Sequence, residues 1–400
     1  MKCIEIDEEK NCCGCRGCEN ICPKKAIHME ENKEGFLYPI IDKNKCVGCG
    51  LCRKVCPILN DLDRTEYYES PICYAAKTIN IDLQTKSSSG GLFGTFAGHI
   101  LRNGGIVVGC EMDDKHKVMH TIVEKEEDLE KVMGSKYVLS DLNNIFTRIK
   151  EELRKGRLVL FSGTPCQVSS LLMFLNKKYD NLYTIEVICH GVPPQKLFTK
   201  YIEYLEKKYD AKLEKFYFRS KQAAKWGTYK ALANFVRTKD GQEQCKFSKK
   251  INADFDPYYW SFLYCKNYRR SCYSCKFAQP KRNADLTLGD FWGIEKIMPD
   301  MIDYNGVSIV VINSPKGKEL LDKNVKKLII KKVDYDTICQ NNGQLRKPSE
   351  MPPERNNWYK NIDDGDFIEN IIVKPNLRSY VKILFPQSLK FKIKKILKKK

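Results

Sequence analysis

Eight cysteines near the start of the chain stand in two arrays with the same spacing. Each array has the form C-x2-C-x2-C-x3-C-P, and the second begins 34 residues after the first. Cysteines at such spacings are ligands for transition metals, either in iron–sulfur clusters or in tetrahedral zinc sites. The arrays consist of Cys12, Cys15, Cys18 and Cys22, followed by Pro23, and of Cys46, Cys49, Cys52 and Cys56, followed by Pro57.

The spacing favours iron–sulfur clusters over zinc. Zinc sites use C-x2-C pairs, but they do not require three evenly stepped cysteines and a fourth before proline, twice over. In the bacterial ferredoxin-type run, the fourth cysteine of each array binds the cluster of the other array. We therefore expect two 4Fe-4S clusters with crossed ligands. One is held by Cys12, Cys15, Cys18 and Cys56, and the other by Cys46, Cys49, Cys52 and Cys22.

Between the arrays, segments 26–30 and 36–41 flank Glu34-Gly35 and predict a β-hairpin. Cys3 and Cys13 fall outside the arrays, and we expect both to be small buried packing residues. Two adjacent clusters form a path for single electrons, so a further redox site is expected in the rest of the chain.

Three later loops have residue types suited to a ligand site. Ser87-Ser88-Ser89-Gly90-Gly91 precedes a predicted helix, whose amino end could hold a pyrophosphate, although serine also caps helices for structural reasons alone. Segments 161–167 and 187–193 each run from a buried strand into a glycine turn and carry one cysteine, Cys166 and Cys189. Ligands of α/β sheets bind at such carboxyl ends of strands. Alternatively, Cys166 or Cys189 could be a nucleophile that His190 activates. Cys189 is poorly placed for this, because neighbouring residues of a strand point to opposite faces of the sheet.

A further C-x2-C pair, Cys272 and Cys275, lies downstream, with Cys265 just before it. With the two loop cysteines it makes four thiols. Spacing alone leaves a zinc site, a third cluster and unrelated thiols open.

Composition places the chain in a reducing compartment. The chain has 19 cysteines, an odd number that cannot all be paired in disulfides. It has no apolar stretch suited to a secretory signal, and none that reaches the roughly 18 residues of a membrane span. We therefore expect a cytoplasmic protein with reduced thiols. Lysine and arginine number 69 against 50 acidic residues, a net charge of +19. That charge favours an acidic partner such as a ferredoxin, and no nucleic-acid-binding motif accompanies it.

Residues 387–400 form a basic tail with seven lysines and several apolar residues. Such a tail suits either peripheral contact with an anionic membrane, at the inner membrane surface, or simple solvation.

The pattern after residue 73 predicts an α/β fold. Short apolar runs at 106–110, 158–161, 183–188 and 307–312 indicate buried strands, and segments 92–102, 126–132, 144–153, 168–176 and 195–207 indicate helices. Their alternation implies a layered domain with a mixed sheet. The expected architecture, α+β or α/β overall, is a ferredoxin-type domain at 1–60, a linker at 61–72, one larger domain in two parts at 73–155 and 156–340, and a C-terminal extension at 341–400.

Taken in order, the later motifs resemble the beta subunit family of coenzyme F420 hydrogenase and dehydrogenase, in its bacterial branch. The resemblance covers roughly residues 73–312, and it rests on the motifs together, since none is specific alone. They are Ser88-Ser89-Gly90-Gly91, Gly134-Ser135-Lys136-Tyr137-Val138, Gly163-Thr164-Pro165-Cys166-Gln167, Cys189-His190-Gly191, Cys272-Tyr273-Ser274-Cys275 and the run from Asp285 to Gly293.

The resemblance implies FAD and a third 4Fe-4S cluster. It implies that Cys166, Cys189, Cys272 and Cys275 hold this cluster. Cys265 does not match a position of the family pattern, and we keep it as a reserve ligand. It also makes Ser88, Ser89, Gly90, Gly91, Ser135, Lys136, Tyr137 and Thr164 candidate flavin contacts. His190 and Asp290 are candidate proton donors, weighed against purely structural roles in their turns.

We therefore expect an iron–sulfur flavoprotein oxidoreductase that passes electrons between a ferredoxin-like donor, the clusters, FAD and an organic substrate. The substrate could be a small molecule or a glycan-linked compound of surface-polysaccharide metabolism, or coenzyme F420 itself. The alternative is a non-catalytic electron-transfer subunit that relays to a partner enzyme.

Overall fold

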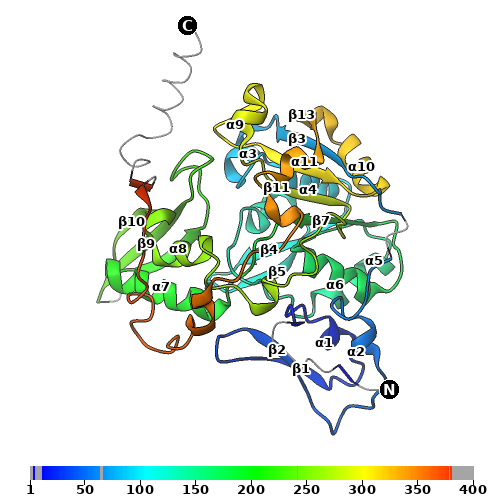
Figure 1. The fold of residues 1–400 in the computed structure, drawn as a ribbon, viewed down its shortest axis with the longest axis horizontal. Coiled ribbons are helices and arrows are strands. Elements are labelled where there is room, and N and C mark those ends of the chain that lie inside the picture. Colours follow the sequence, from blue (N-terminus) through cyan, green and yellow to red (C-terminus); the bar gives the residue numbers. More distant parts are fainter. Residues whose placement is uncertain (1–2, 5–10, 64–65, 241, 378, 381–400) are drawn as a thin grey trace.

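The computed structural model describes residues 3–4, 11–63, 66–240, 242–377 and 379–380. The chain begins with a small unit of two short helices and one hairpin, which lies below the body of the protein in Figure 1. Strands β1 (Ile27–Glu31) and β2 (Leu37–Ile41) pair antiparallel, with Ile27 opposite Ile41. This confirms the predicted hairpin. The helices are α1 (Gly17–Ile21) and α2 (Leu51–Lys54), one in each cysteine array.

An eight-stranded mixed sheet forms the centre of the body, in the order β13-β3-β12-β11-β7-β6-β4-β5. Its strands are rich in Val, Ile and Leu because helices cover both faces of its centre. The expected mixed α/β fold is confirmed. The strands are β3 (Ile72–Thr78), β4 (Ile106–Met112), β5 (Val118–Val123), β6 (Val159–Gly163), β7 (Leu182–Val187), β11 (Leu286–Asp290), β12 (Ser308–Ile312) and β13 (Leu328–Val333).

The four central strands β11, β7, β6 and β4 run parallel. β5 pairs antiparallel with β4 on one side, and β12, β3 and β13 follow β11 on the other, each antiparallel to its neighbour. The carboxyl ends of β6, β7 and β11 therefore meet at one edge of the sheet. Thr164, Cys189 and Asp290 stand at these ends. This edge is where ligands bind in α/β sheets.

Helices pack on the sheet through apolar faces. Side chains of α4 and α10 are buried against one face, with Phe96 and Leu320 fully buried there. Side chains of α5 and α6 are buried against the other, with Phe146 and Leu171 fully buried. The helices of the sheet domain are α3 (Ile81–Lys86), α4 (Leu92–Arg102), the 3-10 helix Glu126–Val132, α5 (Ile145–Arg154), α6 (Pro165–Leu175), α9 (Ile294–Ile297), α10 (Pro315–Asp322) and α11 (Tyr335–Cys339).

A second, three-stranded antiparallel sheet follows the central helix α7 (Gln195–Tyr209), and the sequence patterns did not predict it. It consists of β8 (Lys212–Tyr217), β9 (Lys230–Lys239) and β10 (Gln242–Asn252), and α8 (Pro257–Leu263) follows it. Its alternation of buried and exposed residues is interrupted by bulges in both strand pairs. These bulges weaken the two-residue alternation of apolar and polar side chains by which such strands are recognised in a sequence.

The C-terminal extension contributes to the core. Tyr359, Ile362, Phe367 and Ile368 are buried in the apolar cluster that joins α7, α8 and the second sheet. Phe36 from the front hairpin is fully buried in the same cluster, with its ring 5.9 Å from that of Tyr359. The front unit is thus fixed to the body by apolar packing. The basic tail at 387–400 lies outside the described residues.

Candidate functional site

Three thiols of the first array and one of the second gather around one small cavity in the front unit. Cys12, Cys15, Cys18 and Cys56 line it, which is the set that crossed ligation requires. Three of these side chains are buried. Backbone amides approach sulfur in both arrays, as from Gly14 N to Cys12 Sγ at 3.3 Å. Such amides stabilise thiolates and cluster sulfurs.

The other expected set is closer to the surface. Cys52 is buried and accepts a hydrogen bond from the backbone amide of Ile4 at 3.1 Å. Cys22 accepts one from Ala26 N at 3.3 Å, and Cys49 is exposed. Cys22 packs against the same apolar cluster as Cys52. The two arrays thus provide one inner and one outer group of thiols.

A third cavity, of about 90 Å³, lies at the carboxyl edge of the large sheet. Cys166, Cys189, Cys272 and Cys275 all line it, although they come from three separate segments of the chain. Cys166 is in the first turn of α6, where Thr164 and Gln167 form a capping box, and Thr164 Oγ1 lies 3.1 Å from Cys166 Sγ. Cys265 does not line this cavity.

These four thiols are partly buried. Desolvation raises the pKa of Cys272 to about 12 and that of Cys275 to about 11, whereas the contact with the Cys13 thiol lowers the pKa of Cys166. Without iron, Cys272 and Cys275 stay protonated at neutral pH, whereas bound iron would hold them as thiolates. Arg282, buried in the same wall, pairs with buried Glu186 of β7 and fixes the loop after Cys275 to the sheet.

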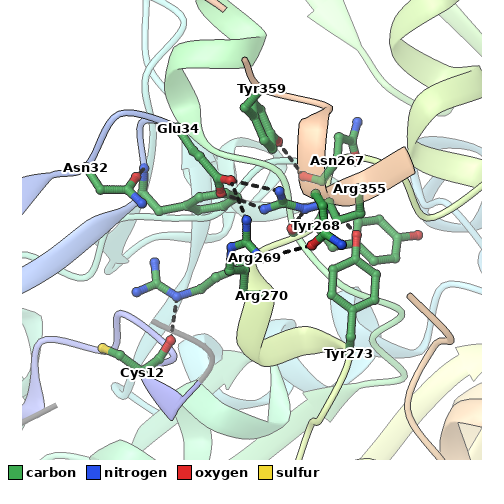
Figure 2. A network of polar contacts seen from close by, with 12 residues as sticks. Cys12, Asn32, Glu34, Asn267, Tyr268, Arg269, Arg270, Tyr273, Arg355 and Tyr359 are labelled. Atoms are coloured by element: carbon green, nitrogen blue, oxygen red, sulfur yellow. Dashed lines mark hydrogen bonds and ion pairs between the residues drawn. The ribbon is translucent and has the colours of Figure 1, made fainter. Parts of the chain in front are cut away.

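Cys13 and Arg269 lie between the front and third cavities. Cys13 lines both cavities, and its thiol interacts with Cys15 on one side and Cys166 on the other, so it is more than the packing residue we expected. Arg269 is fully buried and also lines the third cavity. Its Nε donates to the carbonyl oxygen of Cys12 at 2.6 Å, and its Nη2 to that of Leu37 at 2.9 Å, as Figure 2 shows for Cys12. Among the described residues, its Nη1 has no hydrogen-bond partner.

A larger cavity, of about 410 Å³, adjoins the third cavity on the other side. Most of the residues that the resemblance assigned to flavin binding line it, namely Ser88, Ser89, Gly91, Ser135, Lys136, Tyr137 and Thr164. Gly90 does not line the cavity, but its backbone N donates at 2.9 Å to the Oγ of Ser308, which does. Ser88 Oγ accepts from the amide of Ser135 at 2.8 Å, which joins the two predicted loops.

This cavity suits an elongated anionic ligand with an aromatic part. Gly91 precedes the amino end of α4, where unpaired amides favour a phosphate. Lys136 Nζ donates to the carbonyl oxygens of Met133 at 2.7 Å and Lys131 at 3.2 Å, which leaves one of its three N–H groups for a ligand. The volume is within the roughly 300–1,000 Å³ of small-molecule sites. FAD therefore fits the chemistry of the lining.

Sequence reasoning missed an aromatic and cationic wall of this cavity. Arg219 and Tyr229 come from the second sheet and its loops, and Trp292 follows β11. The Arg219 guanidinium lies 5.1 Å from the ring centre of Tyr229 and 5.6 Å from that of Trp292. The signal that could have found them is the aromatic Trp226–Tyr229 stretch, but only the tertiary fold brings it to the cavity.

The two candidate proton donors have different surroundings. Asp290 is held by Arg219 and by Trp226 Nε1, which donates to its Oδ1 at 2.7 Å. Both carboxylate oxygens of Asp290 accept hydrogen bonds, so the carboxylate is fixed beside Arg219, and its role as a proton donor stays a prediction. His190 lines both the third and the large cavity, and desolvation lowers its pKa.

In the described part of the chain, no group of three or more Cys, His, Asp or Glu side chains is close enough to hold a single metal ion. No helix among the described residues has both the length and the apolar character to cross a membrane.

Comparison with known families matches two regions of the chain. Residues 11–59 match the 4Fe-4S dicluster domain family, and residues 156–337 match the family described as the C terminus of the coenzyme F420 hydrogenase/dehydrogenase beta subunit. No curated protein matches the chain. One similar solved structure is the F420-reducing NiFe hydrogenase complex from Methanosarcina barkeri in a xenon derivative. It is 16% identical, with a TM-score of 0.45, over 71% of this chain and 91% of that chain.

The front unit and its two cysteine arrays define an iron–sulfur protein of the electron-transfer class. The chain joins a region that matches this 4Fe-4S dicluster domain to a region that matches the C terminus of the coenzyme F420 hydrogenase/dehydrogenase beta subunit.

Proposed function

We propose that this protein is an iron–sulfur flavoprotein oxidoreductase that holds three 4Fe-4S clusters and FAD. The observation that carries the proposal is that its cavities adjoin in series. The front and third cavities share Cys13 and Ile58 in their walls. The third and large cavities share Thr164, Cys189, His190, Gly191 and Val192.

In this proposal each cavity has its own task. The front unit accepts single electrons at its outer and inner thiol groups. Cys166, Cys189, Cys272 and Cys275 hold the third cluster, and the large cavity holds FAD against the amino end of α4. A bound flavin exchanges single electrons with clusters and electron pairs with organic substrates.

The residues of the large cavity support this task. Asp290 holds the largely buried guanidinium of Arg219 beside the aromatic wall, where its remaining N–H groups can donate hydrogen bonds to a ligand. His190 lies where it can hold a proton near both cavities. The organic substrate, be it a small molecule, a glycan-linked compound or coenzyme F420, would bind on the open side of the same cavity.

The test is anaerobic purification with iron, sulfide and flavin counted per chain. A chain with three 4Fe-4S clusters should contain about 12 iron atoms, and a chain with FAD in the large cavity should contain about one FAD. Less than a tenth of an equivalent of FAD, with no rebinding of added FAD, would contradict the flavin site. Reduction of a small-molecule acceptor by the isolated chain separates an oxidoreductase from a relay subunit that only passes electrons to a partner enzyme.

A further inference from the structure

The two cysteine arrays of the front unit face different surroundings. The α1 helix of the first array packs on α6 and α5 of the body. Its Arg16 pairs with Asp141, and the side-chain amide of Asn20 donates to the carbonyl oxygen of Asn143 at 2.7 Å. The α2 helix of the second array packs on α1 instead. In Figure 1 the two helices lie side by side, and the second array reaches the body through the segment after Cys56, where Lys276 Nζ donates to the carbonyl oxygen of Asn60 at 2.7 Å.

The ligand set expected for the second cluster is the more exposed of the two sets. Cys49 is exposed and only Cys52 is buried in it, whereas Cys12, Cys18 and Cys56 of the other set are buried. Two apolar side chains beside Cys49 are exposed as well, Val47 at 63% and Leu51 at 38%. Exposed aliphatic side chains beside a cluster site provide an apolar contact area where a partner could approach the thiols closely.

Exposed basic residues flank these apolar side chains in the sequence. Between residues 43 and 60 the sequence has four basic residues and no acidic one. All four of these side chains are exposed, and Lys24 and Lys25, also exposed, follow Cys22, which crossed ligation assigns to the same cluster. We call the surface formed by Lys43, Lys45, Val47, Leu51, Arg53 and Lys54 the outer face.

We propose that the outer face is the docking site for an acidic protein that carries a one-electron centre. The proposal rests on the proposed function, because it requires a cluster at the second array. The basic side chains attract and orient a negative partner, and the apolar side chains let the two surfaces come into contact. In each encounter one electron leaves the centre of the carrier, which is oxidised, and reduces the outer cluster. No bond is formed or broken, and no proton is transferred.

The experiment compares two charge-reversal variants of the full chain, loaded with its clusters. The outer-face variant is Lys43→Glu, Arg53→Glu and Lys54→Glu. The control variant is Lys239→Glu, Lys250→Glu and Lys332→Glu, which changes the net charge equally at exposed positions on β9, β10 and β13. The probe is a reduced acidic 2Fe-2S ferredoxin, and stopped-flow absorbance measures its oxidation over a range of salt concentrations.

The outer-face variant should react with the acidic probe at least about tenfold more slowly at low salt, and its rate should lose most of its salt dependence. The control variant should stay within about threefold of the wild type. A basic cytochrome c that takes electrons from the reduced protein should show the opposite trend with the outer-face variant. Equal effects of both variants, or no effect of the outer-face variant, would overturn the proposal.

A small neutral reductant, photoreduced deazariboflavin, separates docking from cluster loss. If it reduces both variants as fast as the wild type, a slow reaction with ferredoxin is a docking defect. If the outer-face variant instead lost iron, its slow reaction could be caused by loss of a cluster and not by weaker docking. In that case the milder Lys43→Gln, Arg53→Gln and Lys54→Gln variant decides, with an expected slowing of about threefold or more for the acidic probe. If this milder variant holds its clusters and is not slowed, the proposal is wrong.

Discussion

Arg269 donates a hydrogen bond from Nε to the backbone carbonyl of Cys12 at 2.6 Å, across 257 residues of sequence. Its Nη2 donates to Leu37 O, and its guanidinium lies 4.1 Å from the ring centre of Tyr38. One buried side chain thus joins the first cysteine loop and the front hairpin to the segment that carries Cys272. The geometry of the front cavity relative to the third cavity depends on it.

We predict that Arg269→Met destabilises the holoprotein by about 3 kcal/mol or more. The change leaves the buried carbonyl of Cys12 and the partly buried carbonyl of Leu37 without this donor, at about 1–3 kcal/mol for a buried group, and it also removes the aromatic contacts. Anaerobic guanidinium unfolding, followed by cluster absorbance, measures the loss. Arg237→Met is the matched control, because exposed Arg237 also donates to two carbonyls, those of Asp210 and Tyr209. Similar losses in both variants would show that Arg269 has no special role.

The ion pair between Glu34 and Arg355 makes a second connection, from the turn of the front hairpin to the C-terminal extension. Glu34 accepts from Nη1 and Nη2 of Arg355 at 2.8 and 2.6 Å, and Arg355 is fully buried (Figure 2). We predict that Glu34→Gln lowers the free energy of unfolding by about 3 kcal/mol, since it leaves a buried charge without its counterion.

The control for this second connection is Glu354→Gln, which removes an exposed partner of Lys266. We expect little change in unfolding from it, because exposed ion pairs contribute little. A double variant, Glu34→Gln with Arg355→Met, should lose less than the sum of the single losses. Additive losses would mean that the two side chains do not act as a pair.

His120 should make the protein less stable in mild acid. It is buried beside the large cavity, with Nδ1 near Ser140 Oγ and Nε2 near Ser162 O, and desolvation lowers its pKa to about 4. In the unfolded chain the pKa is about 6.5, so the unfolded state binds more protons between pH 6.5 and 4. The contribution of His120 is full above pH 6.5 and is lost as the pH falls, by roughly 1 to 1.5 kcal/mol at pH 5.5.

Thermal unfolding midpoints at pH 8 and pH 5.5 measure this effect. His120→Gln should reduce the difference between the two midpoints, whereas His28→Gln, at an exposed position on β1, should leave it unchanged. An unchanged difference in the His120 variant would contradict the assignment of a buried neutral imidazole.

Iron content distinguishes the ligands of the third cluster. Cys272→Ser should lower the iron content from about 12 to about 8 atoms per chain and remove one set of cluster signals in electron paramagnetic resonance. Cys265→Ser should keep all of them, because Cys265 does not line the third cavity. Loss of iron from the Cys265 variant and retention in the Cys272 variant would reverse this assignment.

The sequence by itself determined the chemistry of the front unit. Ligand spacing is a local property, so the repeated cysteine array already indicated two clusters and their crossed ligands, and the apolar runs at 106–110 and 183–188 already indicated buried strands. The resemblance to a known family selected the four thiols of the third cavity, which spacing alone left open.

Only the tertiary structure decided how these sites adjoin. Cys13 carries no pattern that marks it as lying between two cavities, and Arg269, Arg219 and Tyr229 carry no motif. They reach their places because parallel strands bring distant loops to one edge, and because the front hairpin packs on a helix and a C-terminal segment far away in the chain. Such contacts depend on the packing of whole elements, which no short stretch of residues encodes.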